Sequence, residues 1–146
     1  MLEIHGNLWD FHSKGHFIGI TTNGDINSRG QAVMGRGIAK QAATRYPDLP
    51  YQLAKLIKTT GATSVVHPFF AERFVSIQVK YHWNEQADLA LIENSCRELV
   101  YYLGIWHFPK LYLPRPGCGN GGLDWAIVRP AIAPILDNRF TIVEWR

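Results

Sequence analysis

The chain of 146 residues has 47% hydrophobic and 18% charged residues and a formal net charge of +3. This composition excludes an intrinsically disordered protein, and no apolar run approaches the roughly 18 residues that a membrane-spanning helix requires. We therefore expect a single, monomeric domain over residues 1–146 without a membrane partner. The N-terminus lacks the basic and apolar regions of a secretion signal, so we expect the protein to be cytoplasmic.

The apolar residues follow two periods along the chain, one typical of strands and one of helices. In chain order, we first expect strands at 2–4 and 17–21, followed by a helix from about 35 that ends before Pro47 and a helix at about 50–58. Strands at 64–66 running toward 70 and at 74–79 come next, followed by a helix at about 86–103. The last elements are a strand at 110–113, a helix from 124 and a strand at 140–145. This alternation predicts an α/β fold, a three-layer α/β/α domain around a central mixed sheet.

The helix at about 86–103 has the clearest pattern. Its apolar residues recur at steps of three and four, at Leu89, Ile92, Cys96, Leu99 and Leu103. Gly104 follows directly, and glycine is preferred just beyond a helix end, so we expect the helix to end there. The last helix is expected to begin at Asp124, whose carboxylate is a natural N-cap.

Polar residues and glycines follow the second predicted strand. Thr21-Thr22-Asn23-Gly24 comes directly after it, and Met34-Gly35-Arg36-Gly37-Ile38-Ala39 leads into the next predicted helix. In open α/β sheets, ligands bind beyond the carboxyl ends of strands, and glycines at a helix entrance let a ribose or phosphate lie against the backbone. This segment is therefore a candidate nucleotide site, although a turn-rich connection would use the same glycines.

A second candidate site lies at the end of the strand at 74–79. Side chains two apart on a strand share a face, so if the extension continues, Lys80 and His82 project together toward the glycine loops. A lysine held among apolar neighbours has its charged form disfavoured, so its amine becomes nucleophilic and could attack the anomeric carbon of a sugar, while His82 moves protons. The alternative is a lysine with a buried stem and a solvated amine, beside an exposed histidine.

The most specific motif is Gly117-Cys118-Gly119-Asn120-Gly121-Gly122-Leu123-Asp124-Trp125. Glycines allow the backbone to approach a ligand closely, so successive N–H groups can converge on a phosphate, and the N-terminus of the next helix adds partial positive charge. We interpret the loop as the diphosphate site of a nucleotide-like ligand. A plain strand-to-helix turn is the alternative, but such a turn rarely needs so many glycines.

The sequence predicts no metal site and no cofactor. His12 and His16 are four residues apart, but Gly15 argues against the helix that would hold them as a zinc pair. The two cysteines, Cys96 and Cys118, have no metal-binding spacing, and no obvious base lies beside Cys118 in the sequence.

The motifs together resemble a macrodomain, the ADP-ribose-binding module. The resemblance rests on Gly6-Asn7-Leu8, Asn23, Met34-Gly35-Arg36-Gly37-Ile38-Ala39 and the 117–125 loop, and it covers essentially the whole chain in the same order. Within that superfamily, Lys80-Tyr81-His82-Trp83 and the 117–125 loop look most like the DNA ADP-ribosyl glycohydrolase antitoxins, which remove ADP-ribose from thymine bases in DNA. The resemblance implies ADP-ribose as ligand and an ADP-ribosylated macromolecule as partner, with DNA among the candidates.

The resemblance also implies a role for each motif. Asn7 and Leu8 would lie near the adenine. The residues around the distal ribose would be Gly35, Arg36, Gly37 and Ile38. The diphosphate would be held by Gly119, Asn120, Gly121, Gly122 and Leu123, with Gly117 and Cys118 also contacting the ligand. In the antitoxins, the residue that matches Lys80 is catalytic and the one that matches Asn23 holds the distal ribose. Lys80 would therefore attack C1″ or stabilise it electrostatically, and His82 would assist.

The chain departs from the family pattern at several positions. Asn7 stands where many macrodomains have an Asp that accepts a hydrogen bond from the adenine amino group. The 24–33 loop looks longer than in the antitoxins, and Ile77-Gln78-Val79 replaces a Pro-Thr type segment before Lys80. Gly121 stands where a related vertebrate enzyme has the Asp that works with its catalytic Lys, so that two-residue mechanism does not carry over.

The function expected is therefore an ADP-ribose-binding hydrolase of an ADP-ribosyl linkage, an ADP-ribosyl glycohydrolase that uses Lys80. Two alternatives stay open, a non-catalytic ADP-ribose reader and a phosphatase acting on ADP-ribose 1″-phosphate. The residues leave the target open among a DNA base, a protein carboxylate and a free metabolite.

Overall fold

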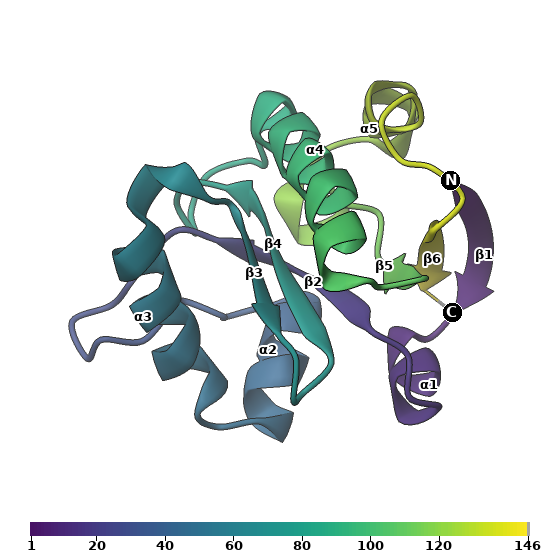
Figure 1. Cartoon of the computed structure of the whole chain (residues 1–146). Helices are drawn as coiled ribbons and strands as arrows, with labels where there is room; N and C mark the ends of the chain where they lie inside the picture. Colours follow the sequence, from purple (N-terminus) through teal and green to yellow (C-terminus); the bar gives the residue numbers. More distant parts are fainter. Residues whose placement is uncertain (146) are drawn as a thin grey trace.

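A six-stranded sheet forms the centre of the protein (Figure 1). The computed structural model describes residues 1–145, except for the side chain of Ala62. The strands are β1 (Leu2–Gly6), β2 (Ile18–Asn23), β3 (Val66–Phe69), β4 (Phe74–Lys80), β5 (Leu111–Leu113) and β6 (Phe140–Trp145). Their order across the sheet is β1-β6-β5-β2-β4-β3, with only β3 antiparallel to its neighbour. The mixed sheet predicted from the sequence is confirmed.

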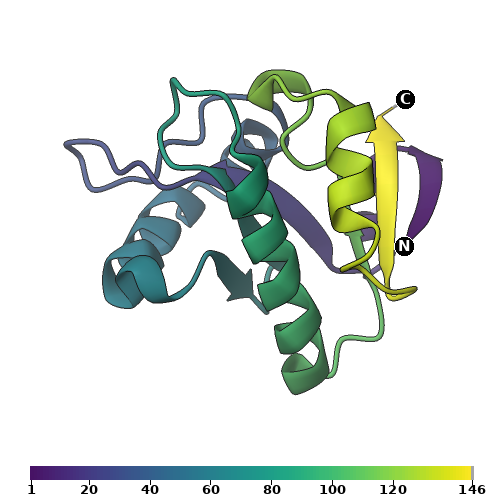
Figure 2. The same ribbon diagram turned by 90° about the horizontal axis from the view of Figure 1, so that it is seen from above.

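Helices cover both faces of this sheet. They are α1 (Leu8–Ser13), α2 (Gly37–Arg45), α3 (Leu49–Thr60), α4 (Leu89–Trp106) and α5 (Trp125–Ile132), with single 3₁₀ turns η1 (Gly61–Thr63) and η2 (Gly119–Gly121). Figures 1 and 2 show α4 and α5 together on one face and α1, α2 and α3 on the other. The three-layer α/β/α architecture is therefore confirmed.

The core is divided by the sheet into two apolar clusters. Strand β4 sends Val75, Ile77 and Val79 into the cluster under α4, and Phe74 into the cluster under α1, α2 and α3. Both faces of the central strands are largely buried, and the polar residues Thr22 of β2 and Ser76 of β4 satisfy each other there through a hydrogen bond of 2.8 Å between their hydroxyl groups. The packing fixes the carboxyl ends of β2, β4, β5 and β6 at one edge of the sheet.

Helix α4 is as long as its sequence pattern predicts, but it begins and ends three residues later along the chain. It starts at Leu89 behind Asp88, whose Oδ1 accepts a hydrogen bond from the N–H of Leu91 at 3.0 Å. It passes through Gly104 to Trp106, so the expected end at Gly104 was wrong. A glycine in a helix costs only about 1 kcal/mol, and Trp106 stacks on Tyr102 with the ring centres 5.0 Å apart. This packing outweighs the weak helix propensity of Gly104.

The short helix α1 was not predicted. Asn7 caps it, since its Oδ1 accepts a hydrogen bond from the N–H of Trp9 at 2.9 Å. Its buried residues are Leu8, Trp9 and His12, which span barely one turn. A pattern this short is too weak to identify a helix from periodicity alone.

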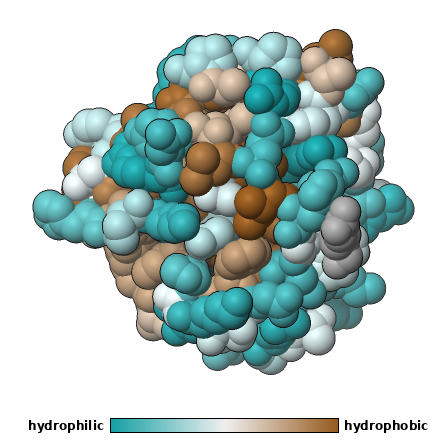
Figure 3. Space-filling model, turned by 90° about the vertical axis from the view of Figure 1, so that its right-hand side faces the viewer, coloured by the Kyte–Doolittle hydropathy of each residue, from teal (hydrophilic) through white to brown (hydrophobic). Residues whose placement is uncertain are grey.

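Strand β1 is an edge of the sheet and remains partly uncovered. Figure 3 shows this side of the molecule, where hydrophobic side chains lie among hydrophilic ones. Leu2 and Ile4 are exposed, whereas Glu3 accepts hydrogen bonds from Nε1 of Trp125 at 3.3 Å and from Nε of Arg129 at 2.9 Å. Glu3 thereby ties the edge strand to α5. Within residues 1–145, no helix is both long and apolar enough to cross a bilayer.

Candidate functional site

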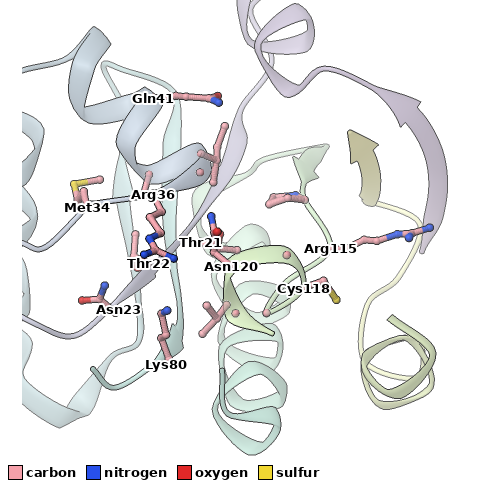
Figure 4. Close-up of a pocket in the computed structure, with 18 of the residues that line it drawn as sticks. Thr21, Thr22, Asn23, Met34, Arg36, Gln41, Lys80, Arg115, Cys118 and Asn120 are labelled. Atoms are coloured by element: carbon pink, nitrogen blue, oxygen red, sulfur yellow. The ribbon is translucent and has the colours of Figure 1, made fainter. Parts of the chain in front are cut away.

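A cleft of about 1070 Å³ opens at the carboxyl ends of the parallel strands. It is lined by Gly6, Leu8, Thr21, Thr22, Asn23, Val33, Met34, Gly35, Arg36, Gly37, Ile38, Ala39, Gln41, Val79, Lys80, Trp83, Asn84, Glu85, Pro114, Arg115, Gly117, Cys118, Gly119, Asn120, Gly121, Val143, Glu144 and Trp145. Its volume lies at the upper end of the usual range for small-molecule sites. Figure 4 shows Asn23, Arg36 and Lys80 on one side and Arg115 and Cys118 on the other.

The N-terminus of α2 forms part of the cleft wall. Arg36 occupies the N-cap position with an extended backbone, and no side chain caps the helix. The first helical residues, Gly37, Ile38 and Ala39, all line the cleft. The first N–H groups of a helix have no partner within the helix and carry partial positive charge. This end of α2 can therefore hold an anion in the cleft.

The glycine loop after β5 forms the opposite wall. Gly117 has φ +78°, and a Cβ there would lie 2.5 Å from Cδ1 of Ile92, so only glycine fits. The loop is held by a hydrogen bond from the N–H of Leu123 to the carbonyl of Gly117 at 3.0 Å, and by another from the N–H of Ala87 to the carbonyl of Gly121 at 2.8 Å. It is thus a fixed structure.

Two backbone donors of this loop are free for a ligand. Among the described residues, the N–H groups of Gly119 and Asn120 have no acceptor, although both residues line the cleft. The Asn120 side chain reaches the other wall, since a Cβ on Gly37 would lie 3.1 Å from Asn120 Nδ2. The two donor-rich walls therefore approach each other closely enough to hold one anionic group between them.

Lys80 is the last residue of β4 and lies at one end of the cleft. It pairs with Asn23 of β2, directly after a register irregularity between Thr22 and Asn23. The Nζ of Lys80 donates a hydrogen bond to the carbonyl of Trp83 at 3.1 Å. No carboxylate among the described residues is close enough to form an ion pair with Lys80. Its amine is available to a ligand because only a neutral carbonyl holds it.

Asn23 is buried beside the cleft, and both ends of its amide are hydrogen-bonded. Nδ2 donates to the carbonyl of Val33 at 3.1 Å, and Oδ1 accepts from the N–H of Asp25 at 2.9 Å. The side chain thus joins the two ends of the 24–33 loop. The amide keeps one N–H and one lone pair for a ligand, since it has two donors and can accept twice.

His82 lies outside the cleft lining. Strand β4 ends at Lys80, so the extension that would bring Lys80 and His82 to one face does not continue. His82 Nδ1 lies 2.9 Å from Asp25 Oδ1, and the N–H of Trp83 donates to Asp25 Oδ2 at 2.8 Å. The hydrogen bond that His82 donates to the Asp25 carboxylate raises the pKa of His82 above its ordinary value of 6.5. Asp25 thus connects the loop after β2 with the loop after β4.

The cleft brings together most of the residues expected from the sequence. Those that line it are Leu8, Asn23, Gly35, Arg36, Gly37, Ile38, Lys80, Gly117, Cys118, Gly119, Asn120 and Gly121. Four do not. Asn7 caps α1, His82 faces Asp25, Gly122 offers its carbonyl to Gln86 Nε2 at 3.0 Å, and Leu123 packs against the core.

Several lining residues carried no role in the sequence analysis. Trp83 is 59% exposed and follows β4, and Trp145 is 63% exposed and ends β6. Both line the cleft at the carboxyl ends of these strands. Arg115 also lines the cleft, with its Nη2 3.1 Å from Glu144 Oε2. A tryptophan just beyond the carboxyl end of a predicted strand is a sequence signal that could have identified Trp83, whereas the place of Trp145 depends on the order of the strands. Among the described residues, no group of three or more His, Cys, Asp or Glu side chains could hold a metal ion.

Comparison with known proteins supports the macrodomain resemblance. No protein-family model matches the chain. A DNA ADP-ribosyl glycohydrolase of Mycobacterium bovis is 32% identical over 100 residues, covering 64% of this chain and 28% of that protein. The solved macrodomain of Thermus aquaticus DarG has a TM-score of 0.74 and 24% identity, covering 99% of this chain and 97% of that one.

A third similar protein was solved with a ligand. The structure of Thermosipho africanus DarTG in complex with ADP-ribose has a TM-score of 0.70 and 21% identity, covering 90% of this chain and 38% of that one. The chain spans less than a third of the length of the Mycobacterium bovis relative. The chain therefore has the fold of the macrodomains, and in sequence it is similar to the DNA ADP-ribosyl glycohydrolases.

Proposed function

We propose that the chain binds ADP-ribose and hydrolyses an ADP-ribosyl linkage with the help of Lys80. The observation that carries this proposal is the cleft itself, in which the uncapped end of α2 faces the free backbone donors of Gly119 and Asn120. A diphosphate fits such a place, because backbone N–H groups and a helix N-terminus favour negative charge. The names of similar proteins, which mention ADP-ribosyl glycohydrolase activity and bound ADP-ribose, agree with it.

The length of the cleft supports a ligand with groups on both sides of the diphosphate. Trp145 ends β6, Lys80 ends β4, and β5 and β2 lie between them in the sheet. Three strand spacings of about 4.8 Å separate the two ends by about 14 Å. We place the adenine at the Trp145 end, where an exposed aromatic ring can stack on it, and the distal ribose at the Lys80 end.

The chemistry we propose at C1″ has two possible routes. In the first, the neutral Lys80 amine attacks C1″, and the bond to the leaving group breaks with its electron pair. The leaving group takes a proton from water, and hydrolysis of the lysine adduct then releases ADP-ribose and restores the amine. In the second, water attacks C1″ while the Lys80 ammonium stabilises the negative charge on the departing group. His82 lies outside the cleft lining, so we assign it no proton transfer.

The test is turnover by wild type and Lys80→Ala, with ADP-ribosylated DNA, ADP-ribosylated protein and ADP-ribose 1″-phosphate as substrates. Lys80→Ala should abolish turnover and change the affinity for ADP-ribose less than about threefold, because the diphosphate contacts remain. Lys55→Ala, on the exposed surface of α3, is the matched control and should behave as wild type. Cyanoborohydride separates the two routes, because the lysine adduct of the first route opens its ribose ring to an imine, which the reagent reduces to a stable secondary amine on Lys80.

Three other results of the same substrate panel would contradict the proposal. Tight binding of ADP-ribose with no substrate consumed would identify a reader. Release of phosphate from ADP-ribose 1″-phosphate alone would identify a phosphatase. Turnover by Lys80→Ala at the wild-type rate would remove Lys80 from the mechanism.

A further inference from the structure

The cleft holds a carboxylate, Glu85, that neither route of the proposed chemistry uses. In both routes a water molecule finally forms a bond to C1″, either in the substrate or in its adduct with Lys80. That water must lose a proton as the bond forms, and a side chain that accepts the proton speeds such a step. Lys80 is already occupied as nucleophile or as cation, so a second group is needed.

Few side chains of the cleft can accept this proton. Among the described residues, the titratable side chains that line the cleft are those of Arg36, Lys80, Glu85, Arg115, Cys118 and Glu144. Arginines stay protonated in proteins, and burial raises the pKa of Cys118, so its thiol keeps its proton. Glu144 ends near Trp145 on β6, two strands away from β4, and it is paired with Arg115 at 3.1 Å and with His5 at 3.0 Å. Glu85 is the remaining candidate.

Glu85 and Lys80 lie on one closed loop at the same end of the cleft. The N–H of Asp88 donates to the carbonyl of Val79 at 2.9 Å and closes this loop. Within it, the N–H of Glu85 donates to the carbonyl of His82 at 3.2 Å. Lys80 and Glu85 form no ion pair with each other, so both keep their charges for a ligand. The Glu85 side chain is 51% exposed and can exchange protons with solvent.

His82 lies between Glu85 and a second carboxylate. Its Nδ1 is 2.9 Å from Asp25 Oδ1, and its Nε2 is 3.6 Å from Glu85 Oε1. The hydrogen bond to Asp25, and to a lesser extent the charge of Glu85, raise the pKa of His82, so its protonated form is favoured. A protonated ring attracts both carboxylates. His82 can therefore orient Glu85 although it does not line the cleft itself.

We propose that Glu85 is a catalytic residue, the general base that accepts the proton of the water attacking C1″, and that His82 positions its carboxylate. This inference rests on the proposed function, because it takes the Lys80 end of the cleft as the place of the reactive ribose. It adds a second residue to the chemistry at C1″ and gives the contact between His82 and Asp25 a role in catalysis.

The step balances as follows in both routes. As the water oxygen bonds to C1″, the electron pair of one O–H bond stays on the oxygen and the proton passes to a Glu85 oxygen. The bond from C1″ to the departing atom breaks with its electron pair, and that atom takes a proton from solvent. In the first route the departing atom is the Lys80 nitrogen. Glu85 then releases its proton to solvent, so one water molecule is consumed for each linkage.

The experiment compares wild type with Glu85→Gln, Glu85→Ala, His82→Phe and Glu93→Ala, on the panel substrate that wild type consumes fastest. Glu93→Ala is the matched control, because it also removes one carboxylate, on α4 beside Arg97, but Glu93 does not line the cleft. Circular dichroism spectra and the affinity for free ADP-ribose monitor the fold and the rest of the cleft.

Glu85→Gln should lower kcat by about 100- to 10,000-fold, the usual contribution of a general base, and should weaken ADP-ribose binding less than about threefold. Added formate should restore part of the turnover of Glu85→Ala, because this small carboxylate can take the place of the missing one. Formate should leave Glu93→Ala unchanged. Equal turnover by wild type and Glu85→Gln, or a loss in Glu85→Ala that formate does not relieve, would overturn the inference.

The pH dependence of His82→Phe tests the positioning role. The charged groups that face His82 are Asp25 and Glu85, and the protonated ring holds both. Because the pKa of His82 is raised, the advantage of wild type in kcat should be present at low pH and disappear as pH rises through the raised value. A difference that stays the same at every pH would show that the ring does not position Glu85 by its charge.

The Lys80→Ala variant separates failure of this inference from failure of the proposed function. If Lys80→Ala loses turnover while Glu85→Gln keeps it, the proposed function stands and Glu85 is not the base. If wild type consumes no substrate of the panel, the proposed hydrolysis fails, and this inference fails with it.

Discussion

Asn23 and Lys80 are paired across the adjacent parallel strands β2 and β4, immediately after the two strands shift register. Because of this shift, the last residues of the two strands lie side by side at the carboxyl ends of the strands, where the cleft opens. Asn23 uses its amide to hold the 24–33 loop, and Lys80 uses its amine to hold the carbonyl of Trp83. The pair therefore links the two loops that border one end of the cleft.

The Asn23 side chain should matter for both stability and activity. Asn23→Ala removes the bonds to the Val33 carbonyl and the Asp25 N–H. Loss of two partly buried hydrogen bonds should lower the free energy of unfolding by about 1–3 kcal/mol. Urea denaturation measures this loss, and turnover should fall at temperatures where the variant is fully folded. A fully stable variant would show that the amide does not hold the loop.

The contact between His82 and Asp25 should depend on pH. The hydrogen bond that His82 donates to Asp25 raises the pKa of His82. For Asp25, partial burial opposes the shift, but the hydrogen bonds from His82 and the Trp83 N–H lower its pKa. The contribution of His82 to stability is therefore complete below its ordinary pKa and is lost as pH rises through the raised value. The contribution of Asp25 is present above its ordinary pKa and is lost as pH falls through the lowered value.

NMR titration of the His82 ring protons tests this coupling directly. In wild type the midpoint should lie above 6.5, the ordinary value for a histidine. In Asp25→Asn the midpoint should fall, because a neutral amide cannot stabilise the imidazolium as a carboxylate does. An unchanged midpoint in Asp25→Asn would mean that Asp25 does not set the protonation of His82.

Two glycine substitutions should have opposite effects on stability. Gly117→Ala places a Cβ 2.5 Å from Ile92 Cδ1 at a residue with φ +78°. Overpacking and backbone strain should together destabilise the protein by about 1–3 kcal/mol or more. Gly104→Ala, in the last turn of α4 with open space around it, should stabilise the protein by about 0.5–1 kcal/mol. Thermal denaturation of the two variants should give shifts of opposite sign, and shifts of the same sign would contradict this account.

The two cysteines should react differently with thiol reagents. Burial raises the pKa of Cys96 to about 12, so Cys96 should not react with the reagent in the native protein. Burial also raises the pKa of Cys118, but this residue is only half-buried and lines the cleft. Mass spectrometry after treatment with iodoacetamide should show slow labelling of Cys118 alone. Saturating ADP-ribose should slow it further, and labelling that ADP-ribose leaves unchanged would argue against binding beside Cys118.

Much of the fold can be predicted from the sequence because most of its strands are rich in buried apolar residues. All six strands were predicted to within a few residues, and Asp124 caps α5 as expected, with its Oδ1 accepting from the N–H of Ala126 at 3.0 Å. The errors occurred where local signals are weak or tertiary packing overrides them. Helix α1 is too short for its period to be recognised, and packing around Trp106 carries α4 past Gly104.

The candidate site was less predictable than the fold. Glycine-rich loops can be recognised from their composition, so most of the residues that form the two cleft walls could be predicted from the sequence. The position of His82 could not, because it depends on where β4 ends and on a carboxylate 57 residues away. Trp145 likewise gains a place in the cleft only through the order of the strands, which brings the end of β6 to the same edge as Lys80.

The central claim is that one ligand bridges the whole cleft, from Trp145 to Lys80. Calorimetric titration of the wild-type protein with ADP-ribose, compared with AMP, tests it most directly. We predict a single site with an affinity for ADP-ribose at least about tenfold higher than for AMP, because only ADP-ribose carries a diphosphate and a distal ribose. Equal affinities for the two ligands, or no heat of binding at millimolar ADP-ribose, would contradict the account.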